Sequence, residues 1–250
     1  MKTAIVTGAA RGIGLATARL FVVQGWQVAM VDRDAAALDE AVATIGAAVR
    51  GFLYDVSDPA AVSAMIAAVL EWSGQIDSLV NNAGVADFGR LEETDFTRWR
   101  TVMETNLDGV FLCAHAALDA LKNTRGSIVN IASISGLRAS TLRVAYGTSK
   151  AGVIQLTQQF AVEMGEFGIR VNCVAPGPVR TKLAMAVHSQ DIIDAYHDAI
   201  PLNRYGTEAE IAEVIVFLAS DKASYVTGQT VAVDGGFEST GVGLPALRLG

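Results

Sequence analysis

Residues 3–14 read TAIVTGAARGIG, a short apolar run that continues into a loop with Gly8, Gly12 and Gly14. Apolar residues then recur at helical spacing through Phe21, which predicts an amphipathic helix. Glycines between a strand and a helix let the backbone turn sharply, approach a pyrophosphate and pack the helix against the strand. The stretch therefore predicts the first strand, loop and helix of a parallel α/β sheet, with a phosphate site in the loop. Such turns also occur without a ligand.

The same alternation of short apolar runs and longer helical stretches continues along the chain. WQVAMVD, VRGFLYDV, IDSLVNNAG, GSIVNIAS, IRVNCVAPG and QTVAVDGG are expected as further strands, with helices near residues 95–122, 144–166 and 208–220. Apolar strands of this kind belong to a parallel sheet that is covered on both faces. No linker interrupts the series. We therefore predict one doubly wound, Rossmann-like α/β domain over residues 1–250, with a parallel seven-stranded sheet.

Composition limits the class of protein. The chain has 250 residues, of which 51% are hydrophobic and 18% charged, so it can bury a large core and is neither disordered nor fibrous. A net charge of −7 without a basic block argues against nucleic acid as a partner. No transmembrane or signal segment is recognisable, so we expect a cytoplasmic protein with no membrane partner. Cys113 and Cys173 are expected in the core.

The end of the second apolar run bears on which dinucleotide could bind. Asp32 follows Gly14 by eighteen residues, where a carboxylate can accept hydrogen bonds from an adenosine ribose. It could also cap the next helix. A carboxylate there would repel the extra phosphate of NADP, so NAD is favoured. Arg11 and Arg33 keep NADP as an alternative, because arginines could hold that phosphate.

A tyrosine and a lysine form the candidate catalytic pair. Tyr146 and Lys150 are four residues apart in VAYGTSKAG and would share one face of a helix. A nearby ammonium stabilises a phenolate and so lowers the pKa of the tyrosine. Ser133 ends the run GSIVNIAS, at the edge where parallel strands form a ligand crevice. Taken alone, a tyrosine and a lysine at this spacing could instead be two solvated side chains on the surface of a helix.

These motifs together resemble the short-chain dehydrogenase/reductase family, whose members have about this length. TGAARGIG at 7–14, DV at 55–56, NNAG at 81–84, Asn106, Ser133, YGTSK at 146–150, PGPVRT at 176–181 and the closing SYVTGQTVAVDGG fall in the family's order and spacing. The resemblance covers roughly residues 3–237. It implies an NAD-dependent oxidoreductase that interconverts a secondary alcohol and a ketone by hydride transfer.

The resemblance also implies a role for each matching residue. Asn106, Ser133, Tyr146 and Lys150 would form the catalytic set, in which Tyr146 exchanges the proton and Ser133 orients the substrate oxygen. Lys150 would tune Tyr146 and bind the nicotinamide ribose, and Asn106 would kink its helix and hold a water linked to Lys150. The cofactor would contact Gly8, Arg11, Gly12, Ile13, Gly14, Asp32, Arg33, Asp55, Val56, Asn82, Ala83, Gly84, Tyr146, Lys150, Pro176, Gly177, Val179 and Thr181. No metal is expected, since the three histidines lack ligand spacing.

The substrate is the least determined part of this interpretation. Family members carry a mobile lid where this chain has residues 183–202, and residues 238–250 form a tail beyond the usual ending. Arg138 or Arg143 could recognise a carboxylate or sugar hydroxyls, so a polyol, hydroxy acid, cyclic alcohol or β-hydroxyacyl substrate stays open. Contacts to the small-molecule alcohol or ketone are expected from Ser133, Ser135, Leu137, Tyr146, Pro178, Met185 and His188.

Two helical segments predict self-association. WRTVMETNLDGVFLCAHAALDALK and VIQLTQQFAVEM are apolar on more than one stripe, so each has a face for its own sheet and another for a neighbour. We expect a homotetramer or a dimer, as in the resembling family. Two alternative functions remain: an NADP-dependent carbonyl or 3-oxoacyl reductase, and a dinucleotide-sensing regulatory protein with little turnover. The intact set of Ser133, Tyr146 and Lys150 favours an enzyme.

Overall fold

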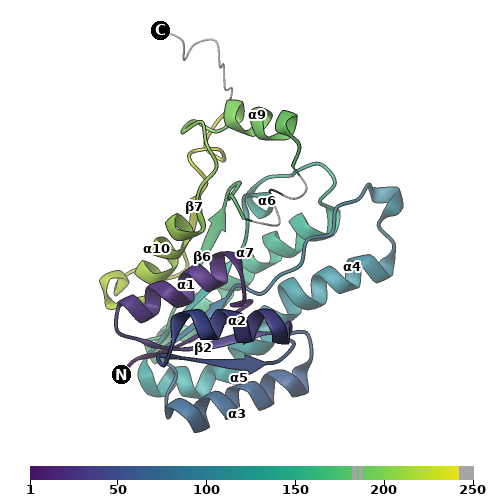
Figure 1. Cartoon of the computed structure of the whole chain (residues 1–250). Coiled ribbons are helices and arrows are strands. Elements are labelled where there is room, and N and C mark those ends of the chain that lie inside the picture. Colours follow the sequence, from purple (N-terminus) through teal and green to yellow (C-terminus); the bar gives the residue numbers. More distant parts are fainter. Residues whose placement is uncertain (182–184, 186–187, 242–250) are drawn as a thin grey trace.

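A parallel sheet forms the centre of the protein in the computed structural model, and helices cover both of its faces (Figure 1). The structure describes residues 1–181, 185 and 188–241. Seven strands follow the order β3-β2-β1-β4-β5-β6-β7, and every neighbouring pair is parallel. The predicted doubly wound fold is confirmed. The strands are β1 (Thr3–Thr7), β2 (Gln27–Asp32), β3 (Val49–Leu53), β4 (Ser78–Asn81), β5 (Ser127–Ile131), β6 (Arg170–Pro176) and β7 (Thr230–Val233).

The helices agree with the expected positions, and the long segment near 95–122 is interrupted. It consists of α4 (Phe96–Met103), a π-helical turn η2 (Glu104–Asp108) and α5 (Gly109–Thr124). No helix in the described part of the chain is both long and apolar enough to span a membrane. The other helices are α1 (Gly12–Val23), α2 (Ala35–Ile45), α3 (Pro59–Ser73), α6 (Ile134–Leu137), α7 (Val144–Met164), α9 (Gln190–Ala199) and α10 (Glu208–Ala219), with 3-10 turns η1 (Leu91–Glu93), η3 (Gly165–Phe167) and η4 (Asp221–Ala223).

The two largest of the three buried apolar clusters in the described residues lie on opposite faces of the sheet, because the central strands bury both faces. Along β1, Ala4 and Val6 point into a cluster with residues of α1, α2 and α10, whereas Ile5 points into a cluster with residues of α3, α5 and α7. All five residues of β1 are buried, which explains why its sequence is apolar without alternation. Cys113 and Cys173 are buried free thiols, as expected.

The glycine loop fixes helix α1 against strand β1. Gly8 and Gly12 have φ of +63° and +59°, a backbone region that favours glycine. A Cβ atom at Gly14 would lie 2.2 Å from the carbonyl oxygen of Gly8, so the first turn of α1 approaches the loop too closely for any side chain. Asn82, which follows β4, donates from Nδ2 to the carbonyls of Thr7 and Gly8 at 2.9 and 3.0 Å. The ends of β1 and β4 are thereby joined.

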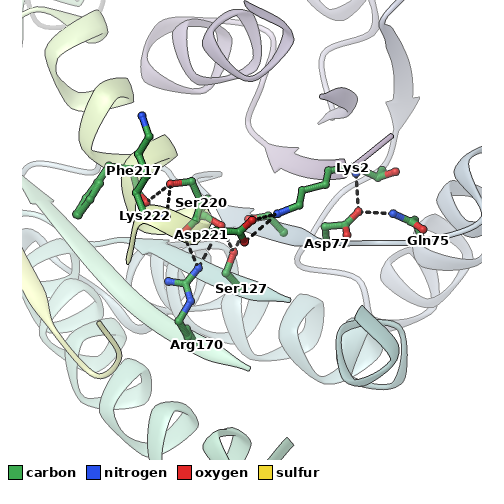
Figure 2. A network of polar contacts seen from close by, with 12 residues as sticks. Lys2, Gln75, Asp77, Ser127, Arg170, Phe217, Ser220, Asp221 and Lys222 are labelled. Carbon is green, nitrogen blue, oxygen red and sulfur yellow. Dashed lines mark hydrogen bonds and ion pairs between the residues drawn. The ribbon is translucent and has the colours of Figure 1, made fainter. Parts of the chain in front are cut away.

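A polar network holds the other edge of the sheet, where the strands begin (Figure 2). Arg170, the first residue of β6, donates to the carbonyls of Leu218, Ala219 and Ser220 at 2.7, 3.2 and 3.0 Å. These carbonyls end α10, where no intrahelical donor remains for them. Ser127, the first residue of β5, also donates to Ala219 at 2.9 Å. Helix α10 is therefore anchored to two strands through its last turn.

We expect Arg170→Met to lower the free energy of unfolding by about 2–3 kcal/mol, because helix-end carbonyls lose a charged donor. The comparison is Lys2→Met, which removes the ion pair with Asp221 at 2.8 Å. That pair is exposed, so its loss should cost below about 1 kcal/mol. Urea unfolding followed by circular dichroism measures both variants. Equal losses would show that the α10 anchor adds nothing beyond a surface ion pair.

Candidate active site

A cleft follows the carboxyl ends of the strands and contains two adjoining cavities. The Asp32 cavity, of about 350 Å³, and the Tyr146 cavity, of about 290 Å³, share Asn82, Gly84, Val85 and Thr181 in their walls. Loops after parallel strands gather at this edge, which is where ligands bind in open α/β sheets. The Asp32 cavity is also lined by Gly8, Arg11, Val31, Arg33, Tyr54, Asp55, Val56, Ala83 and Thr105.

Most of the predicted cofactor residues lie on these two cavities. Ile13, Tyr146, Lys150, Pro176, Gly177 and Val179 line the Tyr146 cavity. Gly8, Arg11, Asp32, Arg33, Asp55, Val56, Asn82, Ala83, Gly84 and Thr181 line the Asp32 cavity. Within the described residues, Gly12 and Gly14 line neither. Gly14 instead makes the close contact between helix and strand.

Asp32 holds its carboxylate against the glycine loop. It is the last residue of β2, and it accepts hydrogen bonds from the backbone N–H groups of Ala10 and Asp34 at 3.0 and 3.1 Å. The N-cap of α2 is Asp34, whose side chain accepts from the N–H of Ala37 at 3.1 Å. The capping alternative for Asp32 is therefore wrong, and its carboxylate belongs to the cavity wall.

Both arginines that could favour NADP are paired with carboxylates. Arg11 lies 2.5 Å from Asp34 and Arg33 lies 3.4 Å from Asp55, measured between nitrogen and oxygen. The hydrogen bond from Arg11 lowers the pKa of Asp34. Burial would raise the pKa of Asp55, but hydrogen bonds from Ser57 and the charge of Arg33 lower it overall. Each arginine at this end of the cleft is thus balanced by an acid.

Lys150 is a buried ammonium beside Tyr146. Helix α7 places both residues on one face, with the Lys150 Nζ atom 5.8 Å from the centre of the Tyr146 ring. Nζ donates to the carbonyl of Ile131, at the end of β5, at 2.8 Å. The side chain is almost fully buried, and this burial lowers the pKa of Lys150 to about 8.

Ser133 and Tyr146 face each other in the Tyr146 cavity. Ser133 follows β5 and caps α6, where its hydroxyl accepts from the N–H of Ser135 at 3.1 Å. Burial raises the pKa of Tyr146, and this outweighs the hydrogen bond from Ser133 and the charge of Arg143, which lower it. Burial thus outweighs the lowering of the Tyr146 pKa that the sequence predicts. Tyr146 is therefore a neutral phenol near pH 7.

Asn106 occupies the π-helical turn and links two parts of the site. Its Oδ1 atom accepts from the N–H of Val85 at 2.8 Å, and its Nδ2 atom donates to the carbonyl of Val85 at 2.9 Å. Nδ2 also donates to Ser149 on α7 at 3.1 Å. Such turns are frequent at functional sites. The predicted interruption at Asn106 is present, and it joins the loop after β4 to the helix of Tyr146.

The predicted substrate residues separate into two groups. Ser133, Ser135, Tyr146, Pro178 and His188 line the Tyr146 cavity, whereas Leu137 and Met185 are absent from its described walls. Leu137 is the last residue of the short helix α6 and is half-exposed. Of the expected lid, residues 183–184 and 186–187 lie outside the described part of the chain, as do 242–250 of the expected tail.

His188 belongs to an aromatic cluster above the Tyr146 cavity. Its Nδ1 atom lies 3.0 Å from the Tyr205 hydroxyl, and its ring stacks on Tyr196 with centres 5.6 Å apart. Burial lowers the pKa of His188, and the charge of Arg143 lowers it further. This histidine is therefore neutral near pH 7.

Some residues that line the two cavities belong to none of the sequence motifs described above. Tyr54 and Thr105 line the Asp32 cavity, and Ser140 lines the Tyr146 cavity next to Ser135, with hydroxyls 3.3 Å apart. Tyr54 directly precedes Asp55, and Thr105 directly precedes Asn106. Adjacency to a predicted site residue is the signal that could have found these two.

Proteins similar to this chain carry the names of oxidoreductases that act on alcohols or ketones. The family described as enoyl-(acyl carrier protein) reductase matches residues 8–238. An "inactive 2-(S)-hydroxypropyl-CoM dehydrogenase 2" of Xanthobacter autotrophicus is 43% identical, over 88% of this chain and 98% of that protein. A galactitol 2-dehydrogenase (L-tagatose-forming) of Cereibacter sphaeroides is 41% identical, over 94% of both chains.

The solved structure of a levodione reductase superposes with a TM-score of 0.92 at 33% identity and covers 96% of this chain and 98% of that one. The chain belongs to the short-chain dehydrogenase/reductase family.

The buried ammonium predicts a pH-dependent stability. Because the folded pKa of Lys150 is about 8 against an ordinary 10.5, the unfolded chain binds the additional proton between these values. Lys150 therefore destabilises the fold at neutral pH, and this cost disappears as the pH rises through that window. Relative to Lys150→Met, the parent should gain about 1–3 kcal/mol of unfolding free energy between pH 7 and pH 10.5.

Urea unfolding at both pH values measures that gain, and Lys222→Met, at an exposed position of η4, serves as the control. A parent-minus-variant difference that stays constant with pH would contradict the burial effect.

Proposed function

We propose that this protein is an NAD-dependent oxidoreductase that interconverts a secondary alcohol and a ketone. The observation that carries this proposal is the arrangement of Ser133, Tyr146 and buried Lys150 in one cavity that shares wall residues with the Asp32 cavity. Asn106 completes the proposed catalytic set by holding the loop after β4 against helix α7. The names of the relatives, which include a galactitol dehydrogenase and a levodione reductase, agree with this class of reaction.

The cleft has the features that a dinucleotide needs. At Gly8 a Cβ atom would lie 2.9 Å from the Cα atom of Ala83, and at Gly84 it would lie 3.2 Å from Asn106 Oδ1 and 3.5 Å from Lys150 Nζ. These two glycines also line the Asp32 cavity with backbone alone, as the close approach of a pyrophosphate and a ribose would require. A nicotinamide bound near Pro176, Gly177, Val179 and Thr181 would supply the hydride acceptor or donor.

The side chains divide the proton chemistry between them. Ser133 would donate a hydrogen bond to the substrate oxygen and orient it beside Tyr146. In the reducing direction the neutral phenol of Tyr146 gives its proton to that oxygen as charge develops there. In the oxidising direction the phenolate takes the proton back. Lys150, protonated below about pH 8, would stabilise the phenolate once its ammonium turns from the Ile131 carbonyl.

The preference for NAD rests on charges at the far end of the cleft. The Asp32 carboxylate lines the cavity where the adenosine ribose would bind, and a 2′-phosphate there would meet a like charge. Arg11 and Arg33, the two arginines near it, are held by Asp34 and Asp55. An arginine that bound an NADP phosphate would share its charge with one of these acids.

An apolar face supports self-association as a dimer or tetramer. Helices α5 and α7 and the π turn surround a surface hollow of about 750 Å³ that includes Leu107, Phe111, Leu112 and Leu156. Phe111 is 46% exposed, which is unusual for a large apolar side chain surrounded by others. A second copy would cover this surface, as expected from the sequence of these two helices.

Tyr146→Phe is expected to lower kcat for both alcohol oxidation and ketone reduction by about 10²–10⁴-fold, because the proton donor is lost. Cofactor affinity, read from NADH fluorescence, should change far less. The assay is a panel of secondary alcohols and ketones with NAD(H) and NADP(H). If no substrate gives a Tyr146-dependent rate while NAD still binds, the dinucleotide-sensing alternative is favoured over the enzyme.

Asp32→Asn is expected to raise the ratio of kcat/KM with NADP to kcat/KM with NAD about tenfold or more, because it removes one like-charge repulsion. Asp39→Asn is the matched control: it makes the same charge change at an exposed position of α2 and should leave the ratio unaltered. A parent protein that uses NADP as well as NAD would overturn the assigned preference.

A further inference from the structure

Arg143 lies in the wall of the Tyr146 cavity with its guanidinium against two aromatic rings. The Cζ atom is 4.7 Å from the centre of the Phe88 ring and 5.6 Å from the centre of the Tyr146 ring. Arg143 directly precedes helix α7, so its backbone position is fixed relative to Tyr146. Stacking on rings uses the faces of a guanidinium and leaves its N–H groups, which lie in the plane, free to bind an acceptor.

No acceptor takes those N–H groups among the residues that the structure describes. The acid of the neighbouring loop, Asp87, is bound by Arg98 through two hydrogen bonds, of 2.7 and 2.5 Å. Arg98 also donates to the carbonyl of Phe88 at 3.2 Å and so holds the loop that carries the stacking ring. Asp87 is thus neutralised by Arg98, and within residues 1–181, 185 and 188–241 no carboxylate forms an ion pair with Arg143.

The Tyr146 cavity has positive charge and no described acidic residue to balance it. Its described walls contain two cationic side chains, Lys150 and Arg143, and no aspartate or glutamate. Lys150 already has a place in the proposed chemistry at Tyr146. His188, also in the wall, is hydrogen-bonded to Tyr205. A half-buried guanidinium with no acid beside it can offer its N–H groups to a ligand that carries negative charge.

We propose that Arg143 is the specificity residue of this site and binds a carboxylate of the substrate, which makes the substrate a short hydroxy acid or keto acid. A guanidinium matches a carboxylate through two parallel hydrogen bonds. Because Arg143 lies so close to Tyr146, the carboxylate and the reacting carbon belong to one small molecule. This inference rests on the proposed function, since Tyr146 must hold the reacting oxygen.

The test compares acids with their neutral esters. The probes are acetoacetate and 4-oxopentanoate, each beside its methyl ester, reduced with NADH by the full-length protein. The parent should prefer the acid of at least one pair. Arg143→Gln should lower the acid-to-ester ratio of kcat/KM about 10- to 100-fold, and Arg143→Lys should lie between, because it keeps the charge without the planar fork.

Arg138→Gln is the matched control. Arg138 stacks on Phe237, with Cζ 4.1 Å from the ring centre, and is not part of the described wall of the Tyr146 cavity. Its replacement makes the same charge change and should leave the acid-to-ester ratio unaltered. Equal kcat/KM for acid and ester in the parent, or a ratio that Arg143→Gln does not change, would overturn the proposal.

A binding measurement separates this proposal from the proposed function. Calorimetry on Tyr146→Phe with NADH gives the affinity for each acid and ester without turnover. Tighter binding of the acid that is lost in Tyr146→Phe/Arg143→Gln supports carboxylate recognition, even if no ketone is reduced by the parent and the enzyme assignment fails. Equal affinity for acid and ester overturns carboxylate recognition, even if neutral ketones are turned over.

Discussion

The contact between helix α1 and the end of strand β1 governs the geometry of the whole cleft. At Gly14 there is no space for a side chain, since a Cβ atom would lie 2.2 Å from the Gly8 carbonyl oxygen and 2.6 Å from Asn82 Nδ2. Asn82 donates to two carbonyls at this same contact. Because Asn82 also lines both cavities, one close approach fixes the glycine loop, the end of β4 and the boundary between the cavities. A glycine at position 14 is a packing requirement, and the bound phosphate would benefit from it indirectly.

Two features of the site lower the stability of the fold. Lys150 is buried and donates to the Ile131 carbonyl, and burial lowers its pKa because the interior disfavours its charge. The π turn at Asn106 interrupts a helix that would otherwise run unbroken from α4 into α5. Folding alone favours neither feature, since an apolar residue and a regular helix would be more stable. Their joint presence around Tyr146 is what a site selected for chemistry would show.

The sequence predicted the fold and the edge of the sheet that carries the site, because both depend on backbone pattern. Apolar runs mark the strands, and polar residues directly after them meet at one edge whatever the loops do. The partners of individual side chains could not be predicted from this backbone pattern. Asp34 caps α2 in place of Asp32, two residues away, and Leu137 is outside the cavity although Ser135 is inside. These outcomes depend on the path of short loops and on the direction of each side chain.

Charge is distributed along the cleft in a way that the net charge of −7 does not reveal. At the Asp32 end, arginines and acids are paired, and the Asp32 carboxylate accepts hydrogen bonds from the backbone N–H groups of Ala10 and Asp34. At the Tyr146 end, positive charge is in excess among the described residues. Arg143 stacks on Phe88, and the nearby acid, Asp87, is bound by Arg98. A neutral ribose suits the first end and an anion suits the second. Under the proposed function, one cleft would disfavour a phosphate on its cofactor and favour a carboxylate on its substrate, because its two ends present opposite signs of charge.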